Sequence, residues 1–419
     1  MSKQAGKSPT RSQHPPFDGR DSWDTHWQAL GWPWRTEPEI DEQRQAKLAK
    51  YCAIVPDIKK GIYPFKDVKL SRADIEWLLA RHENGHGTID WSGVYQHKHE
   101  GLDLRGADLR QVDLHGLPLI CMRGGLWTEW IGATLEQRDM ARVNLENANL
   151  SSANLEGAYL SNAYLERANL RSAHLEKADL YKAHLEGADL SRTHLEGTSL
   201  RGAFFDVASN INEASLGNEK LGFALLADVH WDDVNLSVVD WTRVKMLGDE
   251  NEAQRPKRWD GEVKKKDERI GDYRMAVRAY RQLAVKLQAQ GLNEESVNFA
   301  YRAQLLQRVV FWKQRKFGQY LFSLFRDLLA GYGYRPERSF LAYLLVIVVF
   351  MVTYHVLSPQ LAWKEALVVS MTAFHGRGFF FSTFSPSDPL AFVSAIEALV
   401  GLIIEVTFIA TLTQRFFGR

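Results

Sequence analysis

One short segment has the residue types of a catalytic zinc site. His82, Glu83 and His86 satisfy the H-E-x-x-H pattern, in which two histidines on one helix face bind zinc and the glutamate acts as a general base. That chemistry requires a helix that continues through the motif. Asn84 and Gly85 lie inside it, and both residue types favour the end of a helix. We therefore expect no catalytic zinc at this position.

Three other histidines, His174, His184 and His194, recur every ten residues. We interpret them as surface residues rather than metal ligands, with a pH-sensitive surface as the alternative. The two cysteines, Cys52 and Cys121, occur in unrelated contexts, which excludes a disulfide framework and fits a reducing compartment. No phosphate-binding glycine loop or nucleophile elbow occurs. The sequence predicts that the chain is not an enzyme and requires neither a metal nor a cofactor.

Two carboxylates interrupt a long apolar run near the end of the chain. Glu397 and Glu405 are separated by Gly401 at spacings of four, so the three share one face of a helix. A carboxylate in the middle of a membrane costs about 2.5–3.5 kcal/mol, and such residues face protein or water rather than lipid. We therefore expect neither Glu397 nor Glu405 to face lipid.

The runs that would carry these residues indicate two membrane spans. Residues 340–357 are apolar without a charge, and residues 390–412 contain only the two glutamates as charges. Arg335 and Arg338 precede the first run, and Arg415 and Arg419 follow the second. By the positive-inside rule both termini are cytoplasmic, which predicts a protein of the inner (plasma) membrane. The net charge of +1 gives no general attraction to nucleic acid, and we expect none as a partner.

The segment between the runs contains a predicted short helix, 363–372, and then a loop with two glycines. That loop reads Phe374, His375, Gly376, Arg377 and Gly378. A span, a half-helix, a glycine loop and a second span resemble the pore module of two-transmembrane potassium-type channels. The resemblance implies an oligomeric channel, expected to be a homotetramer in a lipid bilayer, with permeant ions as its ligands. Gly401 matches the hinge glycine of the inner helix in that family. By position, the resemblance implies that Glu405 lines the pore below this hinge and that Glu397 braces the filter.

The loop departs from the family at its centre. Those channels use T-V-G-Y-G, whose carbonyl oxygens replace the hydration shell of potassium, whereas this chain has F-H-G-R-G. Four copies of Arg377 at the pore mouth would repel cations. Alternatively, Arg377 turns behind the filter and pairs with Glu365, Asp388 or Glu397. Because an acidic cavity at Glu405 would favour cations, the ion selectivity stays open.

A five-residue period dominates the middle of the chain. It matches neither a helix nor a flat strand, because both would scatter these leucines over their surfaces. A square coil with one unit per side accommodates it, with each central leucine and the alanine two residues before it pointing inward. The leucine positions are Leu104, Leu109, Leu114 and Leu119, then Leu135, Met140 and every fifth residue from Leu145 to Leu200, and finally Phe205. A weaker run contains Leu226, Trp231, Leu236 and Trp241.

Units such as Ala107-Asp108-Leu109 and Ala168-Asn169-Leu170 resemble the pentapeptide-repeat family. The resemblance implies a right-handed quadrilateral β-helix. Glutamates recur every ten residues on its exterior, from Glu136 to Glu196, and form acidic ladders on two opposite faces. Some members of the family imitate DNA and bind type II topoisomerases. The near-balanced charge of this block instead favours a solvated surface or a docking surface for a protein partner.

The sequence thus predicts a multidomain protein: a β-helix, a helical hairpin and a two-helix transmembrane pore module. The expected order is a flexible tail (1–24), a mixed helical region (25–100), the β-helix (101–245), a charged linker (246–265), a helical hairpin with a juxtamembrane helix (266–330), and the pore domain (331–419). The favoured function is an oligomeric ion channel with a cytoplasmic repeat body. The alternative is a membrane-anchored scaffold whose β-helix binds a protein partner.

Overall fold

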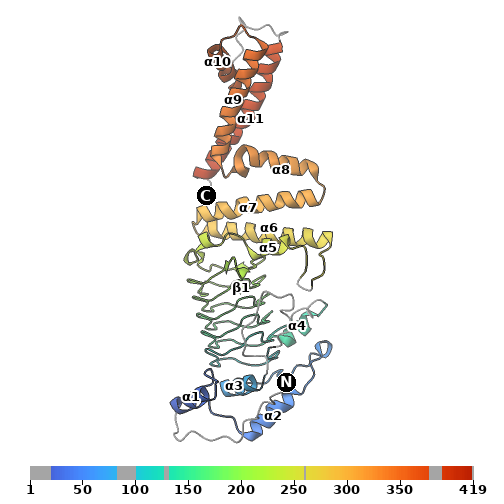
Figure 1. Cartoon of the computed structure of the whole chain (residues 1–419), viewed down its shortest axis with the longest axis vertical. Helices are drawn as coiled ribbons and strands as arrows, with labels where there is room; N and C mark the ends of the chain where they lie inside the picture. The colour runs from blue at the N-terminus through green and yellow to red at the C-terminus, as the bar shows by residue number, and fades with distance from the viewer. Residues whose placement is uncertain (1–19, 83–100, 127–131, 259–260, 377–388, 418–419) are drawn as a thin grey trace, which may run out of the picture. The chain divides into compact units, whose positions relative to one another are not determined.

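The computed structural model describes residues 20–82, 101–126, 132–258, 261–376 and 389–417. The chain divides into two compact units, Met1–Ser296 and Val297–Arg419. The first contains the coiled repeats and the second consists of helices (Figure 1).

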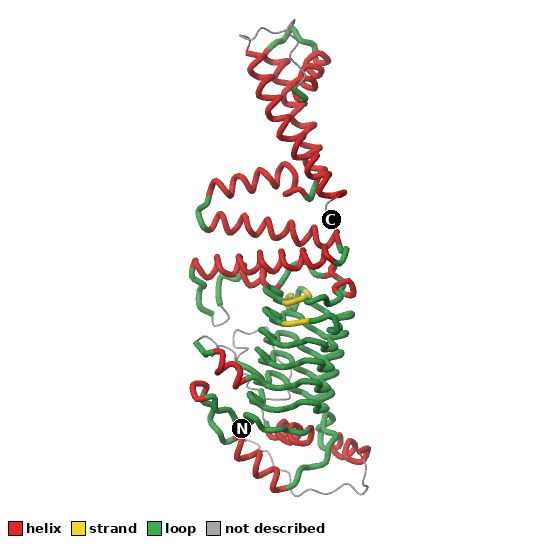
Figure 2. The backbone as a smooth tube through the Cα atoms, turned by 180° about the vertical axis from the view of Figure 1, so that it is seen from behind, coloured by secondary structure: helices red, strands yellow, loops and turns green. Residues whose placement is uncertain are grey.

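The repeats form a coil in which residues 20 positions apart lie side by side. Single parallel bridges join them in columns, such as Asn144, Tyr164, His184 and Phe204. Regular strands are few, as Figure 2 shows, because each side of the coil offers only one or two residues for pairing. Strand β1 (Phe204–Phe205) pairs in parallel with β4 (His230–Trp231), and β2 (Gly217–Asn218) pairs antiparallel with β3 (Gly222–Phe223).

The interior of the coil confirms the predicted period. Every fifth residue from Leu145 to Leu200 is fully buried or nearly so, as are the alanines two positions earlier from Ala148 to Ala188. The weaker run from Leu226 to Trp241 is also buried. Two residues after each leucine from Leu145 to Leu200 the backbone has a φ between +54° and +70°. A left-handed residue at this point makes the tight turn at each corner of the coil.

The prediction for Leu135, Glu136 and Met140 was wrong. They belong to helix α4 (Leu135–Ala141) rather than to the coil, and Leu135 is 73% exposed. The helix begins with a capping box in which the amide of Gln137 donates to Thr134 Oγ1 and the amide of Thr134 donates to Gln137 Oε1. This local capping outweighs the five-residue period. Because α4 lies outside the coil, Asp108 pairs with Asn144, 36 residues further along.

The N-terminal region docks on one end of the coil. It contains α1 (Arg20–Ala29), α2 (Glu42–Cys52), the 3₁₀ helix η1 (Ile58–Lys60) and α3 (Arg72–Arg81). Helix α3 begins with a capping box between Ser71 and Asp74. Arg72 donates to the carbonyls of Asp113 and His115 at 3.2 and 3.1 Å, which attaches α3 to the first coils. Of the H-E-x-x-H motif, only His82 lies within the described residues.

The other end of the coil is closed by a segment that the sequence predicted to be a charged linker. Two short 3₁₀ helices, η4 (Leu236–Val238) and η5 (Trp241–Arg243), precede helix α5 (Gly248–Gln254). Asp249 is fully buried and accepts from the amides of Leu226 and Ala227 at 2.6 and 3.2 Å. This segment therefore differs from a linker, because its Asp249 accepts from backbone amides that the last coil leaves open.

The rest of the described chain is helical. The segments are α6 (Lys266–Ala289), α7 (Asn293–Lys313), α8 (Phe317–Ala330), the 3₁₀ helix η6 (Gly331–Gly333), α9 (Pro336–Leu357), α10 (Trp363–Phe374) and α11 (Pro389–Phe417). Because α6 lies in the first unit and most of α7 in the second, their pairing as a hairpin stays a prediction. Within the described residues, α9 and α11 are the two helices long and apolar enough to cross a membrane.

Candidate functional site

A buried carboxylate joins the three helices of the predicted pore module. Glu397 lies on α11 and is fully buried. Tyr354 of α9 donates its hydroxyl to Glu397 Oε2 at 2.8 Å, and Ser370 of α10 lies 2.5 Å from Oε1. The Ser370 hydroxyl also lies 3.0 Å from the carbonyl of Ile347 on α9. Glu397 therefore links α9, α10 and α11 through hydrogen bonds, and its role in bracing a filter stays a prediction.

One turn further along α11, Gly401 allows the backbone of α10 to approach closely. A Cβ atom at this position would lie 2.1 Å from the carbonyl oxygen of Phe374. Phe374 is the last residue of α10, and its buried ring makes an edge-to-face contact with Tyr343 at 4.8 Å between centroids. The absence of a side chain at residue 401 is therefore required by packing, whether or not the helix bends there.

One turn beyond Gly401 on α11, Glu405 faces His375, which follows Phe374. His375 Nδ1 lies 2.7 Å from the carbonyl of Met371, so this nitrogen carries a proton and donates it. The other ring nitrogen, Nε2, lies 3.4 Å from Glu405 Oε1. Both side chains are partly exposed. Gly376 then leaves the helix with a φ of +66°, a conformation that suits glycine.

The structure thus brings most of the predicted site residues together along one face of α11. Glu397 and Gly401 contact Ser370 and Phe374 of α10, and Glu405 contacts His375, which follows the helix. Arg377, Gly378 and Asp388 lie outside the described residues. Of the other partners expected for Arg377, Glu397 already has two hydroxyl neighbours, and Glu365 accepts from the amide of Ala362 at 3.0 Å.

Sequence reasoning missed Tyr354 and Ser370. Each is a polar residue within an apolar helix, and that pattern could have indicated a buried hydrogen-bond partner for Glu397. It also missed Asp327 on α8, which accepts from Tyr301 and Arg308 of α7 at 2.9 and 2.7 Å and from Arg338 of α9 at 2.8 Å. This carboxylate connects α7 and α8 to the start of α9.

We expect the Asp327 cluster to give the helical unit an acid-sensitive stability. Burial raises the pKa of the Asp327 carboxyl, but the hydrogen bonds from Arg308 and Tyr301 outweigh it and hold that pKa below its ordinary value of 3.8. A carboxyl with a lowered folded-state pKa stabilises the fold above its ordinary pKa, and the stabilisation is lost as the pH falls through the folded-state value. Asp327→Asn should cost roughly 1–3 kcal/mol at neutral pH.

Hydrogen exchange of the α7 and α8 amides, followed from neutral pH to below pH 3.8, measures this effect. Protection should differ between wild type and Asp327→Asn at neutral pH, and the difference should shrink at the acid end. Glu219→Gln is the matched control, because Glu219 pairs with Lys245 on an exposed surface. A difference that persists unchanged into acid would contradict the role assigned to the Asp327 charge.

Comparison with known proteins identifies the repeats. Residues 131–167 and 168–206 match the family model for pentapeptide repeats. Among solved structures, the chain is similar to the pentapeptide repeat protein HetL of Nostoc sp. strain PCC 7120, which is involved in heterocyst differentiation regulation. The two are 29% identical over 30% of this chain and 52% of HetL, with a TM-score of 0.20. This chain thus spans about half the length of HetL.

Two further cyanobacterial structures are similar to part of the chain. Rfr23 of Cyanothece 51142 is 23% identical over 30% of this chain and 91% of its own, with a TM-score of 0.17. A second pentapeptide repeat protein from Nostoc PCC 7120 is 29% identical over 27% of this chain and 72% of its own, also with a TM-score of 0.17. No curated protein matches the chain. The family model shows that residues 131–206 carry pentapeptide repeats.

Proposed function

We propose that this protein is an oligomeric ion channel, with four subunits as the expected number, whose pore is formed by residues 331–419. The observation that supports this most is the packing of α10 against both α9 and α11. The Gly401 contact brings the carboxyl end of this short helix against the second apolar helix. A protein that only needed an anchor in the membrane would gain nothing from a third, short helix held in this way.

The position of Glu405 supports a role in the ion path. It is partly exposed and faces the carboxyl end of α10, where the helix dipole places partial negative charge. Together these groups would attract cations into a cavity. Arg377 would oppose that attraction if it faced the same path, and its removal should therefore increase the preference for cations.

The apolar surface of α8 supports a position at the membrane surface. The large apolar residues Phe317, Leu321, Phe322, Leu324, Phe325 and Leu328 are exposed in the single chain. Such a face suits a helix that lies in the interface between lipid headgroups and water. In this proposal both termini and the repeats are cytoplasmic, and the repeats form the regulatory or assembly body. The protein is not an enzyme.

The test is single-channel recording of purified full-length protein in planar bilayers under asymmetric KCl. The wild type should open, and Arg377→Ala should move the reversal potential towards the cation equilibrium value. Glu405→Gln should move it in the opposite direction. Lys364→Ala is the control, because it removes a positive charge from the exposed first turn of α10, at the end of the helix away from Gly401.

A second function is a membrane-anchored scaffold whose β-helix binds a protein partner. The regular exterior of the coil favours it, because equivalent side chains recur on the same face at every turn. If correctly assembled wild type and all three variants show no channel openings in the same recordings, the result would contradict the channel hypothesis and favour the scaffold.

A further inference from the structure

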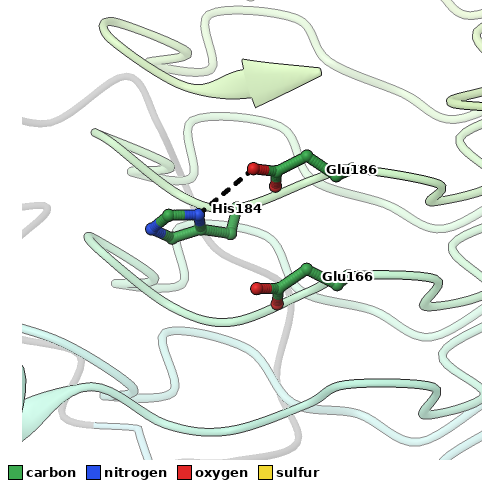
Figure 3. Close-up of side chains that lie close together, drawn as sticks. All are labelled: Glu166, His184 and Glu186. Carbon is green, nitrogen blue, oxygen red and sulfur yellow. Dashed lines mark hydrogen bonds and ion pairs between the residues drawn. The ribbon is translucent and has the colours of Figure 1, made fainter. Parts of the chain in front are cut away.

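The exterior of the coil places one histidine between two glutamates of adjacent turns. His184 and Glu186 flank the inward Leu185, so both side chains point outward from the same unit. Glu166 occupies the position of Glu186 one turn earlier. Figure 3 shows the two carboxylates one above the other on the same side of the imidazole ring. His184 Nδ1 lies 3.4 Å from Glu186 Oε1, and one ligand atom from each residue lies within 4.8 Å of the others.

A second cluster of the same design lies ten residues along the chain, on the opposite face. It consists of Glu176, His194 and Glu196, whose ligand atoms also lie within 4.8 Å of one another. Glu196 is the most enclosed of these residues, with a side chain 7% exposed. Its Oε1 accepts from Ser215 at 2.6 Å. The two clusters are hereafter the His184 cluster and the His194 cluster.

Each carboxylate of both clusters has one buried oxygen that lacks a hydrogen-bond donor among the described residues. The Oε2 atoms of Glu166, Glu176, Glu186 and Glu196 are all buried, and none accepts a hydrogen bond within the described part of the chain. Burial also raises the pKa of the Glu166 carboxyl, because its charged form loses solvation. Like charges one strand spacing apart repel each other. A bound cation would offset both costs.

The donor set indicates which cation. One imidazole nitrogen with two carboxylates suits Zn²⁺ and related first-row ions, whereas Ca²⁺ and Mg²⁺ prefer six or more oxygen ligands. Donors bound to one zinc ion lie about 3–3.6 Å apart, given bonds of about 2.0–2.2 Å. Small side-chain rotations therefore suffice to close each cluster. Three protein ligands would leave a fourth position for water.

Ring stacking holds both histidines in place. His184 stacks on Phe204 of the next turn, with centroids 4.8 Å apart, and His194 stacks on His174 of the previous turn at 4.6 Å. A histidine with a fixed ring loses little side-chain entropy when it binds a metal. The stack also identifies a substitution that preserves the coil, since Phe204 occupies the position of His184 one turn later.

We propose that the His184 and His194 clusters each bind one Zn²⁺ ion and thereby crosslink adjacent turns of the β-helix. Each ion would take one carboxylate from one turn and the histidine and second carboxylate from the next. The proposal does not depend on channel activity. The expected consequence is a β-helix that is more stable with zinc than without it.

The test uses full-length protein without an affinity tag, stripped of metal with a chelator and titrated with Co²⁺ as a coloured substitute for zinc. The wild type should bind two ions per chain, one for each cluster, and show visible d–d absorption. His184→Phe should remove one ion, and the double variant with His194→Phe should remove both. His230→Phe is the matched control, because exposed His230 stacks on Phe204 at 4.4 Å but belongs to neither cluster.

A second readout separates binding in the clusters from binding elsewhere. Zn²⁺ should raise the melting temperature of the β-helix in the wild type and in His230→Phe, and leave it unchanged in the double variant. Unchanged melting of the double variant in the absence of metal would establish that it is folded. Absence of cobalt absorption from the wild type, or equal binding by wild type and double variant, would overturn the proposal.

Discussion

Gly401→Ala is expected to separate α10 from α11 and to abolish ion conduction. The added Cβ would lie 2.1 Å from the Phe374 carbonyl oxygen, whereas a normal carbon–oxygen contact is about 3.3 Å. The two helices would have to move apart by about 1 Å, because both contacting groups are fixed to backbone. Overpacking of this kind costs roughly 1–3 kcal/mol or more. The movement would also displace His375 from Glu405.

Gly271→Ala is the matched control for this variant. Gly271 lies within helix α6, and a Cβ there would meet nothing within 4 Å. Alanine is a better helix former than glycine by about 0.5–1 kcal/mol, so this change should leave stability unchanged or increase it. Thermal melting of the detergent-solubilised oligomer and bilayer recording measure both variants. Gly401→Ala protein with normal melting and altered opening alone would indicate a hinge rather than a packing role.

Glu397→Ala is expected to destabilise the three-helix module by about 2–4 kcal/mol. The change leaves a cavity in a fully buried site and removes the acceptor of the Tyr354 hydroxyl. Ser370 would keep the Ile347 carbonyl as its partner. Glu397→Gln should cost far less, because the amide keeps the volume and one oxygen acceptor. Tyr354→Phe should fall between the two variants.

Melting of the solubilised oligomer, with size-exclusion chromatography for its assembly, measures the Glu397 series. Thr407→Ala on the same helix is the control, since the Thr407 hydroxyl donates to the carbonyl of Ile403 within its own helix. It should melt as the wild type does. Equal loss of stability in Glu397→Ala and Glu397→Gln would show that the charge, rather than the volume and hydrogen bonds, is what the site requires.

The parts of the fold with a regular period could be predicted from the sequence. The inward leucines of the coil and the two apolar helices follow from spacing and composition, and both can be determined without knowing which residues come into contact in the fold. The period failed at Leu135, because the Thr134 capping box starts a helix within the repeat region. The prediction of a charged linker failed at residues 246–265 for a different reason, since charge alone does not reveal that Asp249 is buried against amides of the last coil.

The candidate site was predicted less completely, for a related reason. Glu397, Gly401 and Glu405 were assigned to one helix face, since spacing alone determines that. Their partners Tyr354 and Phe374 lie on other helices, and only the packing of those helices brings them near. The two proposed metal clusters were not predicted from the sequence. His184 and Glu186 lie two residues apart, but Glu166 becomes their neighbour only because residues 20 positions apart lie side by side in the coil.

Because one turn of the coil contains 20 residues, the position of a residue in the sequence determines both its height along the coil and the face on which it lies. Insertion of one five-residue unit would rotate every later exterior side chain by a quarter turn, and would separate each later glutamate from the face it now shares. Insertion of 20 residues would keep every face aligned and lengthen the coil by about 4.8 Å. Helix α4 shows how extra residues are accommodated without rotation, since the chain leaves the coil and returns to the same column at Asn144.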